Sequence, residues 1–214
     1  MVTRWALAAV LLGRGAEAAE WRVELLGGMA ASFGSPLTVR QAGEPDLEIA
    51  ADWAGRSLDS PIYYAARLGR WTQSTGLSLQ LVHHKLYLQN PPPEIQAFSV
   101  SHGYNLLTLE GGWLAGGFEL RAGAGLVIAH PESTVRGQAR EETGGLFGGY
   151  HATGPTLAIA AGRWLDLGGR FRVGAEARFT ASWARVPVAG GEASVPDRSV
   201  HLLVGVAYRF APPQ

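Results

Sequence analysis

The chain has 214 residues, including 29 glycines, 12 prolines and no cysteine, and its 18 basic and 18 acidic side chains give a net charge of zero. A neutral chain with scattered basic residues lacks the electrostatic footprint of a nucleic-acid-binding protein, and the absence of cysteine excludes disulfides and thiol catalysis. The 47% hydrophobic content excludes a disordered chain, and the length suits one all-β domain.

The first eighteen residues predict a secretory signal peptide. A short basic start at 1–4 precedes an apolar run at 5–12, and the Ala-Glu-Ala motif at 16–18 has the small-x-small pattern of a cleavage site. We therefore expect residues 1–18 to be removed and residues 19–214 to form the mature domain. The competing interpretation is a short N-terminal helix of a cytosolic protein.

Beyond residue 20 the dominant signal is an alternation of apolar and polar side chains, which predicts strands with one apolar and one polar face. It is clearest over 171–183, where every odd position is apolar, and it recurs over 118–130 and 198–210. No apolar stretch approaches the roughly 20 residues that a membrane-spanning helix needs. The eight predicted strands lie at about 20–30, 61–71, 76–88, 97–112, 117–130, 153–165, 170–187 and 198–210.

The connections between these strands are predicted to alternate in length. An even number of strands, with short turns at one end and long loops at the other, is typical of bacterial outer-membrane barrels. Within the first long connection, residues 37–53 could form a hairpin above the membrane or two more spanning strands, which would make ten. The short connections are expected near 72–75, 113–116 and 166–169, and the long ones at 31–60, 89–96, 131–152 and 188–197.

The polar faces combine large charges with glycine. A soluble lipocalin-like barrel, our third alternative, carries its polar face outside, whereas this mixture suits the interior of a small barrel whose apolar face meets lipid. Aromatic residues near strand ends, among them Trp71, Trp113 and Trp164, predict an interfacial girdle. Side chains expected to form a charge-paired plug in the lumen, and so to disfavour a porin, are Arg22, Glu24, Arg67, Glu119, Arg121, Arg172, Glu176 and Arg178, with Glu110 as a possible addition.

With this strand count the chain resembles the small eight-stranded outer-membrane barrels, of the OmpA transmembrane-domain type and of the lipid A-modifying type. The resemblance covers almost the whole mature chain and rests on architecture rather than on a diagnostic motif. The sequence Tyr208-Arg209-Phe210 is similar to the aromatic-ended insertion signal of such proteins, although four residues follow it. The resemblance implies an all-β, eight-stranded antiparallel transmembrane up-and-down β-barrel in the cell outer membrane of a Gram-negative bacterium.

Histidines are predicted to gather at the outer rim of this barrel. A hairpin symmetric about residues 92–93 places His84 opposite Ser101 and His83 opposite His102. The alternation of the third strand turns His84 inward and His83 outward. The five rim histidines are His83, His84, His102, His130 and His151, and the only lysine, Lys85, lies among them.

An enzyme interpretation of this rim uses a serine, a histidine and a carboxylate. Ser101 is the candidate nucleophile, His84 or His102 the candidate base, and Glu94 or Glu132 the group that orients the base. This chemistry fits an acyl hydrolase acting on lipid A, which is rich in esters. The lipid A deacylases that the chain resembles in architecture imply a His-x-Ser pattern, and this pattern is absent here.

Two other interpretations compete with catalysis. A metal site with His83, His84, His102 and His130 as ligands is disfavoured, because adjacent histidines on a strand point to opposite faces. The favoured interpretation is structural, with the rim side chains bonding lipid head groups and neighbouring strands. We thus expect no metal and no cofactor. The leading prediction is a structural or interaction protein of the cell envelope that contacts outer-membrane lipid and lipopolysaccharide, with another envelope protein as a further partner of the outer loops. The alternative is a lipid A-modifying acyl hydrolase.

Overall fold

The computed structural model describes residues 19–140 and 148–210, so the predicted signal peptide lies outside the described residues. Eight antiparallel strands form a ring that closes where the first strand pairs with the last, with Trp21 opposite Phe210. The predicted eight-stranded antiparallel barrel is therefore confirmed. In ring order the strands are β1 (Glu20–Ser32), β5 (Tyr64–Trp71), β6 (Thr75–His83), β9 (Tyr104–Ala115), β10 (Phe118–Ala129), β13 (His151–Gly168), β14 (Phe171–Val188) and β15 (Gly191–Phe210).

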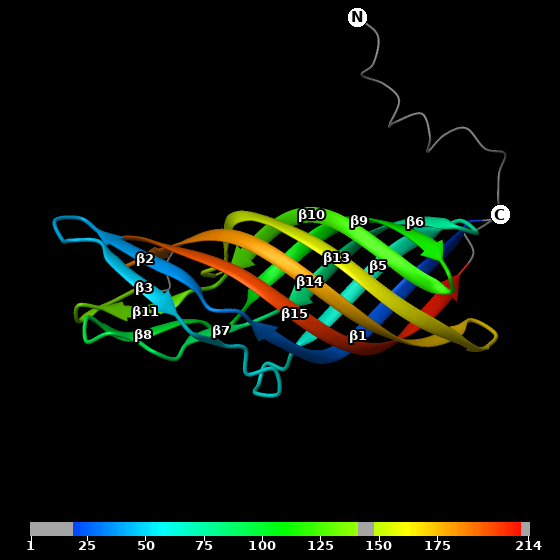
Figure 1. Cartoon of the computed structure of the whole chain (residues 1–214), viewed down its shortest axis with the longest axis horizontal. Helices are drawn as coiled ribbons and strands as arrows, with labels where there is room; N and C mark the ends of the chain where they lie inside the picture. Colours follow the sequence, from blue (N-terminus) through cyan, green and yellow to red (C-terminus); the bar gives the residue numbers. More distant parts are fainter. Residues whose placement is uncertain (1–18, 141–147, 211–214) are drawn as a thin grey trace, which may run out of the picture.

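Seven shorter strands continue the barrel wall at one end (Figure 1). β2 (Ser35–Gln41) and β3 (Leu47–Ala51) extend the barrel sheet, since β2 pairs with the start of β15. A separate sheet contains β4 (Trp53–Ala54), β7 (Leu86–Leu88), β8 (Ile95–Val100), β11 (Glu132–Val135) and β12 (Gln138–Ala139). We call these seven strands, together with the β14–β15 hairpin over 184–195, the head.

The head encloses an apolar core of its own. Leu37, Leu86 and Val195 are fully buried, and the ring of Trp53 lies 6.2 Å from that of Phe98. Because the upper ends of the barrel strands supply part of this core, the head is continuous with the barrel wall. The start of β1 and the end of β15, which pair with each other, lie at the opposite end of the molecule (Figure 1).

The structure decides between the alternatives for one predicted segment and differs from the prediction for three others. Residues 37–53 form the β2–β3 hairpin of the head, so the ring keeps eight strands. The predicted strands at 76–88 and 97–112 are each interrupted, at 84–85 and 101–103, where the chain leaves the barrel wall for the second sheet. The long loop predicted at 188–197 is wrong. β14 and β15 continue to a tight turn at 189–190 because Ala193 and Val195 keep the inward alternation and pack in the head core.

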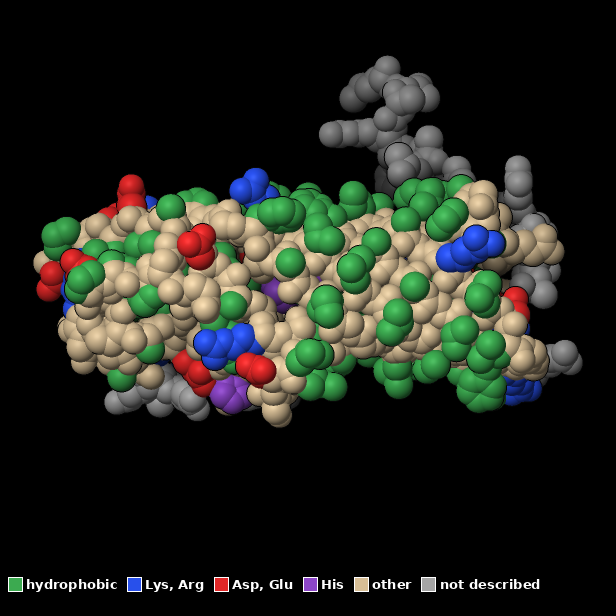
Figure 2. All heavy atoms as spheres, turned by 60° about the horizontal axis from the view of Figure 1, so that its bottom comes forward, with side chains coloured by type: hydrophobic (Ala, Val, Ile, Leu, Met, Phe, Trp, Pro, Cys, Tyr) green, Lys and Arg blue, Asp and Glu red, His purple; other side chains and the backbone are tan. Residues whose placement is uncertain are grey.

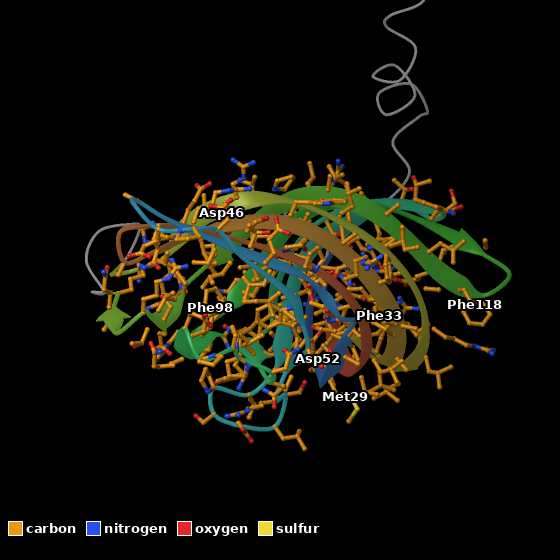
Figure 3. All side chains as sticks on the ribbon, turned by 60° about the vertical axis from the view of Figure 1, so that its left-hand side comes forward. Met29, Phe33, Asp46, Asp52, Phe98 and Phe118 are labelled. Atoms are coloured by element: carbon orange, nitrogen blue, oxygen red, sulfur yellow. The ribbon has the colours of Figure 1, made fainter. Side chains whose placement is uncertain are left out.

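The barrel is apolar outside and polar inside. On β15, Val200 and Leu202 are 38% and 57% exposed, whereas Ser199 and His201, which alternate with them, are fully buried. Exposed apolar side chains surround the barrel half of the molecule (Figure 2), and Met29 and Phe118 extend away from its ribbon (Figure 3). All eight strands of the ring carry such exposed apolar side chains, whereas soluble monomers rarely expose large contiguous apolar patches. The ring therefore spans a membrane, and a closed barrel with an even number of strands is of the outer-membrane type.

Among the described residues, no helix is long and apolar enough to cross a membrane.

The predicted aromatic girdle is wrong for two of its tryptophans. Trp113 is 42% exposed and faces outward, but Trp71 and Trp164 are buried inside the barrel. Trp71 fits there because Gly76 leaves the space, since a Cβ on that glycine would lie 2.4 Å from the indole. The guanidinium of Arg22 lies 4.7 Å from the Trp71 ring centre, so a cation–π contact holds the indole in the lumen.

Candidate functional site

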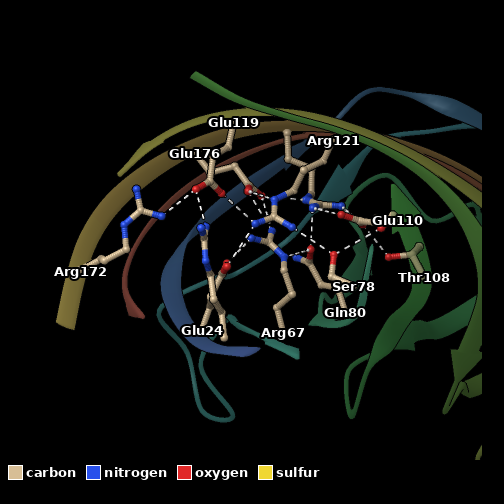
Figure 4. Close-up of polar contacts among 12 residues, drawn as sticks. Glu24, Arg67, Ser78, Gln80, Thr108, Glu110, Glu119, Arg121, Arg172 and Glu176 are labelled. Carbon is tan, nitrogen blue, oxygen red and sulfur yellow. Dashed lines mark hydrogen bonds and ion pairs between the residues drawn. The ribbon is translucent and has the colours of Figure 1, made fainter. Parts of the chain in front are cut away.

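Charged side chains cross the barrel lumen and pair with one another (Figure 4). Arg67 lies at the centre, where it binds Glu24, contacts Glu176 at 2.8 Å and donates from Nε to Gln80 at 2.7 Å. The side chain of Arg67 has no exposed surface. Each guanidinium nitrogen of Arg67 thus donates to at least one acceptor, which lowers the cost of burying the charge.

The rest of the lumen continues the same pattern. Arg178 binds Glu110 at 2.6 Å, and Glu119 accepts from Arg22 at 2.6 Å and from Arg172 at 2.7 Å. All the residues predicted to face the lumen do so, and they make ion pairs there. They are Arg22, Glu24, Arg67, Glu119, Arg121, Arg172, Glu176 and Arg178, together with Glu110.

A second polar group lies higher in the lumen, around His84. Its Nε2 atom is 3.2 Å from Ser32 Oγ, 3.3 Å from Ser199 Oγ and 3.6 Å from Asp197 Oδ2. His84 and Asp197 have almost no exposed surface, and a single ring nitrogen faces all three partners. This group is therefore closed to substrates, and it lacks the two-nitrogen relay of a serine hydrolase.

The exposed candidate site lies where the barrel meets the head, and we call Ser101, His102, His130 and Glu132 the rim cluster. His102 Nδ1 is 2.7 Å from Glu132 Oε1 and 3.3 Å from Ser101 Oγ. The Ser101 hydroxyl donates to the other carboxylate oxygen of Glu132, and the two imidazole centres are 5.0 Å apart. The side chains of His102 and Glu132 are 54% and 35% exposed, so the cluster is open to solvent.

Two neighbouring chain bends bring the rim cluster together. The segment between β8 and β9 turns at Gly103, whose φ of 136° favours glycine. The segment between β10 and β11 turns at the same height, where the His130 N–H donates to the Gly103 carbonyl at 3.0 Å. Beyond both bends, Glu132 pairs with Ser99 across β11 and β8. Residues thirty positions apart in the chain therefore meet at one corner.

Further contacts fix the orientation of these side chains. The Tyr150 hydroxyl donates to the His102 carbonyl at 2.9 Å, and its ring meets the His130 ring edge-on at 5.0 Å. The Ser99 hydroxyl lies 3.4 Å from Glu132 Oε2. Glu132 is thus held by hydroxyls on one side and by an imidazole on the other.

The structure brings together three of the five predicted catalytic residues and separates the other two. Ser101, His102 and Glu132 are in contact, as described above. His84 points inward, as its parity predicted, and lies in the closed group of the upper lumen. Glu94 lies in the exposed β7–β8 connection, where its carbonyl accepts from the backbone N–H of Arg136.

The predicted position of His84 directly across the hairpin from Ser101 is wrong. Leu86 pairs with Val100, and the Tyr104 N–H donates to the His84 carbonyl at 2.6 Å. The register of β7 with β8 is thus shifted by one residue from that of a hairpin symmetric about residues 92–93. The pairing of the two strands ends at Leu86 and does not extend to His84. The neighbouring Lys85 is buried and donates from Nζ to the Asp59 carbonyl at 2.8 Å. Its burial lowers the pKa of the ammonium group.

A different outward surface lies where the apolar belt ends below the head. Trp183 is 53% exposed on β14, Arg185 is the next outward residue toward the head, and Arg198 lies on the adjacent strand opposite Ala181. Arg185 and Arg198 are exposed, and neither makes an ion pair with the described residues. We call Trp183, Arg185 and Arg198 the arginine patch.

No protein-family model and no curated protein sequence matches the chain. Among solved structures it is similar to Ail, the attachment invasion locus protein of Yersinia pestis, at 12% identity over 91% of this chain and 99% of that chain, with a TM-score of 0.42. It is also similar to Neisserial surface protein A, at 11% identity over 92% and 100%, with a TM-score of 0.42. It is similar as well to the outer membrane protein OprG from Pseudomonas aeruginosa, at 11% identity over 92% of this chain and 98% of that chain, with a TM-score of 0.44. The fold described above rests on the strand pairing of this chain.

Proposed function

We propose that the protein is an outer-membrane anchor with a sealed lumen, which holds the head at the outer surface and contacts lipopolysaccharide through the arginine patch. We place the protein partner of the envelope at the head, because the head projects beyond the apolar belt. The anchor role goes beyond the fold itself, and it rests on the buried ion pairs of the lumen and on the arginine patch.

The buried ion pairs support a sealed lumen. An eight-stranded barrel has an interior just wide enough to be filled by side chains. Here Arg67 and Arg178 reach across it to Glu176 and Glu110, with distances of 2.8 and 2.6 Å. Opening a water-filled path would require breaking several buried charge pairs at once, so a porin is the disfavoured function.

The arginine patch is the observation that carries the contact with lipopolysaccharide. Arginine binds phosphate through charge-assisted hydrogen bonds, and tryptophan at the edge of an apolar belt anchors a barrel at the level of the lipid head groups. At the outer edge of the belt, Arg185 lies two residues beyond Trp183 toward the head. Arg198 lies on the adjacent strand, opposite the residue two positions before Trp183. The phosphates of lipopolysaccharide lie at that level of the outer leaflet.

Replacing Arg185 and Arg198 together by alanine is expected to weaken binding of lipopolysaccharide roughly 10- to 30-fold. Each basic side chain near an anionic lipid surface contributes about 1 kcal/mol, and every 1.4 kcal/mol corresponds to a tenfold change in Kd. The measurement is titration of the refolded full chain with purified lipopolysaccharide.

The matched control is the double variant Arg70→Ala with Arg163→Ala, which removes two exposed arginines from the opposite end of the barrel. Its affinity should equal that of the wild type, and dephosphorylated lipopolysaccharide should bind both proteins weakly. Equal affinities of the Arg185/Arg198 variant and the wild type would refute the proposed contact.

An acyl hydrolase acting on lipid A is the second candidate function, and the contacts among Ser101, His102 and Glu132 favour it. The three groups lie together at an exposed corner, at the end of the molecule that faces the outer leaflet in this proposal. Against it, His102 uses the same Nδ1 atom toward both partners, and the Ser101 hydroxyl donates to Glu132 rather than to the imidazole. A serine hydrolase needs the base to accept that proton.

Mass spectrometry of lipid A separates the two functions. Because the serine proton points to a carboxylate, we expect lipid A from cells that express the wild type and from cells that express Ser101→Ala to carry the same acyl chains. Loss of an acyl chain with the wild type alone would establish the hydrolase and would reject the structural role for the rim cluster.

A further inference from the structure

We propose that the rim cluster binds a divalent transition-metal ion of borderline softness, such as Zn²⁺, through His102, His130 and Glu132. One ligand atom from each residue, an imidazole nitrogen or a carboxylate oxygen, lies within 4.8 Å of the other two. In a tetrahedral Zn²⁺ site, with metal–ligand bonds of about 2.0–2.1 Å, ligand atoms are roughly 3.3 Å apart. Small side-chain rotations therefore bring the three atoms to binding distance.

The kinds of ligand atom select the class of ion. Two imidazoles and one carboxylate suit zinc and its neighbours in the transition series, whereas Ca²⁺ and Mg²⁺ prefer sets of oxygen atoms alone. Three protein ligands leave at least one position for water or another small ligand, as in zinc sites that are not purely structural. His102 is exposed and Glu132 is partly exposed above the buried His130, so an ion can reach the cluster from the outer surface.

The surroundings of the three ligands already hold them in place. The Glu132 oxygen that does not face His102 accepts a hydrogen bond from Ser101, and the Tyr150 hydroxyl binds the His102 carbonyl at 2.9 Å. Partners of this kind orient metal ligands and raise affinity. Gly149 contributes in another way, because a Cβ there would lie 3.0 Å from the imidazole of His130. The chain thus leaves room for that ring.

Adjacency excludes only His83 and His84 from sharing a metal ion, and it does not affect His102 and His130. His83 and His84 are adjacent and cannot share an ion, and the structure places His84 in the closed group of the upper lumen. His102 and His130 come from two different bends, which the hydrogen bond from the His130 N–H to the Gly103 carbonyl holds side by side. An ion at this site would join the β8–β9 bend to the β10–β11 bend, and so fix the head to the barrel.

The site is independent of the proposed lipid contact, because the arginine patch lies on β14 and β15. It shares His102 and Glu132 with the hydrolase candidate, but His130 belongs to the metal site alone. The variant His130→Gln therefore distinguishes them. It removes a metal ligand and leaves the contacts of Ser101 with His102 and Glu132 unchanged.

The test is calorimetric titration of the refolded, metal-free full chain with Zn²⁺, together with visible absorption of the Co²⁺ form. We expect one ion per chain, and at least a tenfold weaker affinity for His102→Ala and for His130→Gln. A large excess of Mg²⁺ should leave the Zn²⁺ titration unchanged. The control is His83→Gln, a rim histidine that bonds Asn105 at 2.8 Å outside the cluster, and it should bind like the wild type.

Folding of each variant is checked by heat-modifiable migration, which reports the intact barrel without reference to metal. Folded wild-type protein that binds no Zn²⁺ would overturn the proposal. Equal binding by wild type and the double variant His102→Ala with His130→Gln would overturn it as well, and so would displacement of Zn²⁺ by Mg²⁺. None of these outcomes depends on whether the arginine patch binds lipopolysaccharide.

Discussion

Replacing Arg67 by methionine is expected to lower the free energy of unfolding of the barrel by about 3–5 kcal/mol, the cost of leaving buried charges without their partner. Arg67 is the shared partner of Glu24 and Glu176, and its guanidinium also donates to Gln80 at 2.7 Å. Methionine fills a similar space but donates nothing. Glu24 and Glu176, which have almost no exposed surface, would each lose one arginine partner and keep Arg121 and Arg178 respectively, both at 3.1 Å.

Urea unfolding of the protein refolded in lipid bilayers measures this loss. Arg40→Met is the matched control, because Arg40 pairs with Asp46 at 3.0 Å but is 52% exposed. Exposed pairs contribute about 0–1 kcal/mol. Adding Glu24→Gln to Arg67→Met should restore part of the stability, since Glu24 would otherwise stay buried with Arg121 as its one remaining arginine partner. A change below 1 kcal/mol for Arg67→Met would mean that water reaches the lumen and that the barrel is not sealed.

The barrel could be predicted from the sequence because, in a membrane, the apolar face of each strand points outward to lipid and the polar face points into the barrel. Along β14, every second residue from Phe171 to Trp183 is apolar, and the charges between them point into the lumen. Period-two alternation is a local property of the sequence, so it can be recognised without knowing which strands pair. The same signal could have found Asp197, which continues the inward alternation of Val195 and Ser199, but the loop predicted at 188–197 included it.

The head and the rim cluster depend on contacts that alternation does not encode. Trp71 is an aromatic residue near a strand end, and only the facing Gly76 reveals that the indole has space inside. Ser101 and His102 were predicted with Glu132, but the partner role of His130 depends on the bend at Gly103, which joins two loops. Where strands leave the barrel wall, the local pattern no longer fixes which residues meet.

Replacing Trp53 by alanine is expected to loosen the head and to leave the barrel folded. Trp53 packs on Phe98 with ring centres 6.2 Å apart, and its indole N–H donates to Ser35 Oγ at 2.8 Å. Truncation of a buried aromatic side chain to alanine typically costs about 3–5 kcal/mol. The barrel ring does not depend on this core, because its wall is closed by the β1–β15 pairing.

Hydrogen exchange measured by mass spectrometry localises the effect. Protection should fall in β2, β3, β7 and β8, and remain unchanged in the lower part of β15, since segments with separate cores can open separately. Leu58→Ala is the control, because this side chain is 79% exposed and its removal leaves no cavity. Equal loss of protection in the head and the barrel would contradict this prediction and would mean that the two unfold as one cooperative unit. The long strands β14 and β15 would then transmit a change in the head core to the membrane-spanning ring.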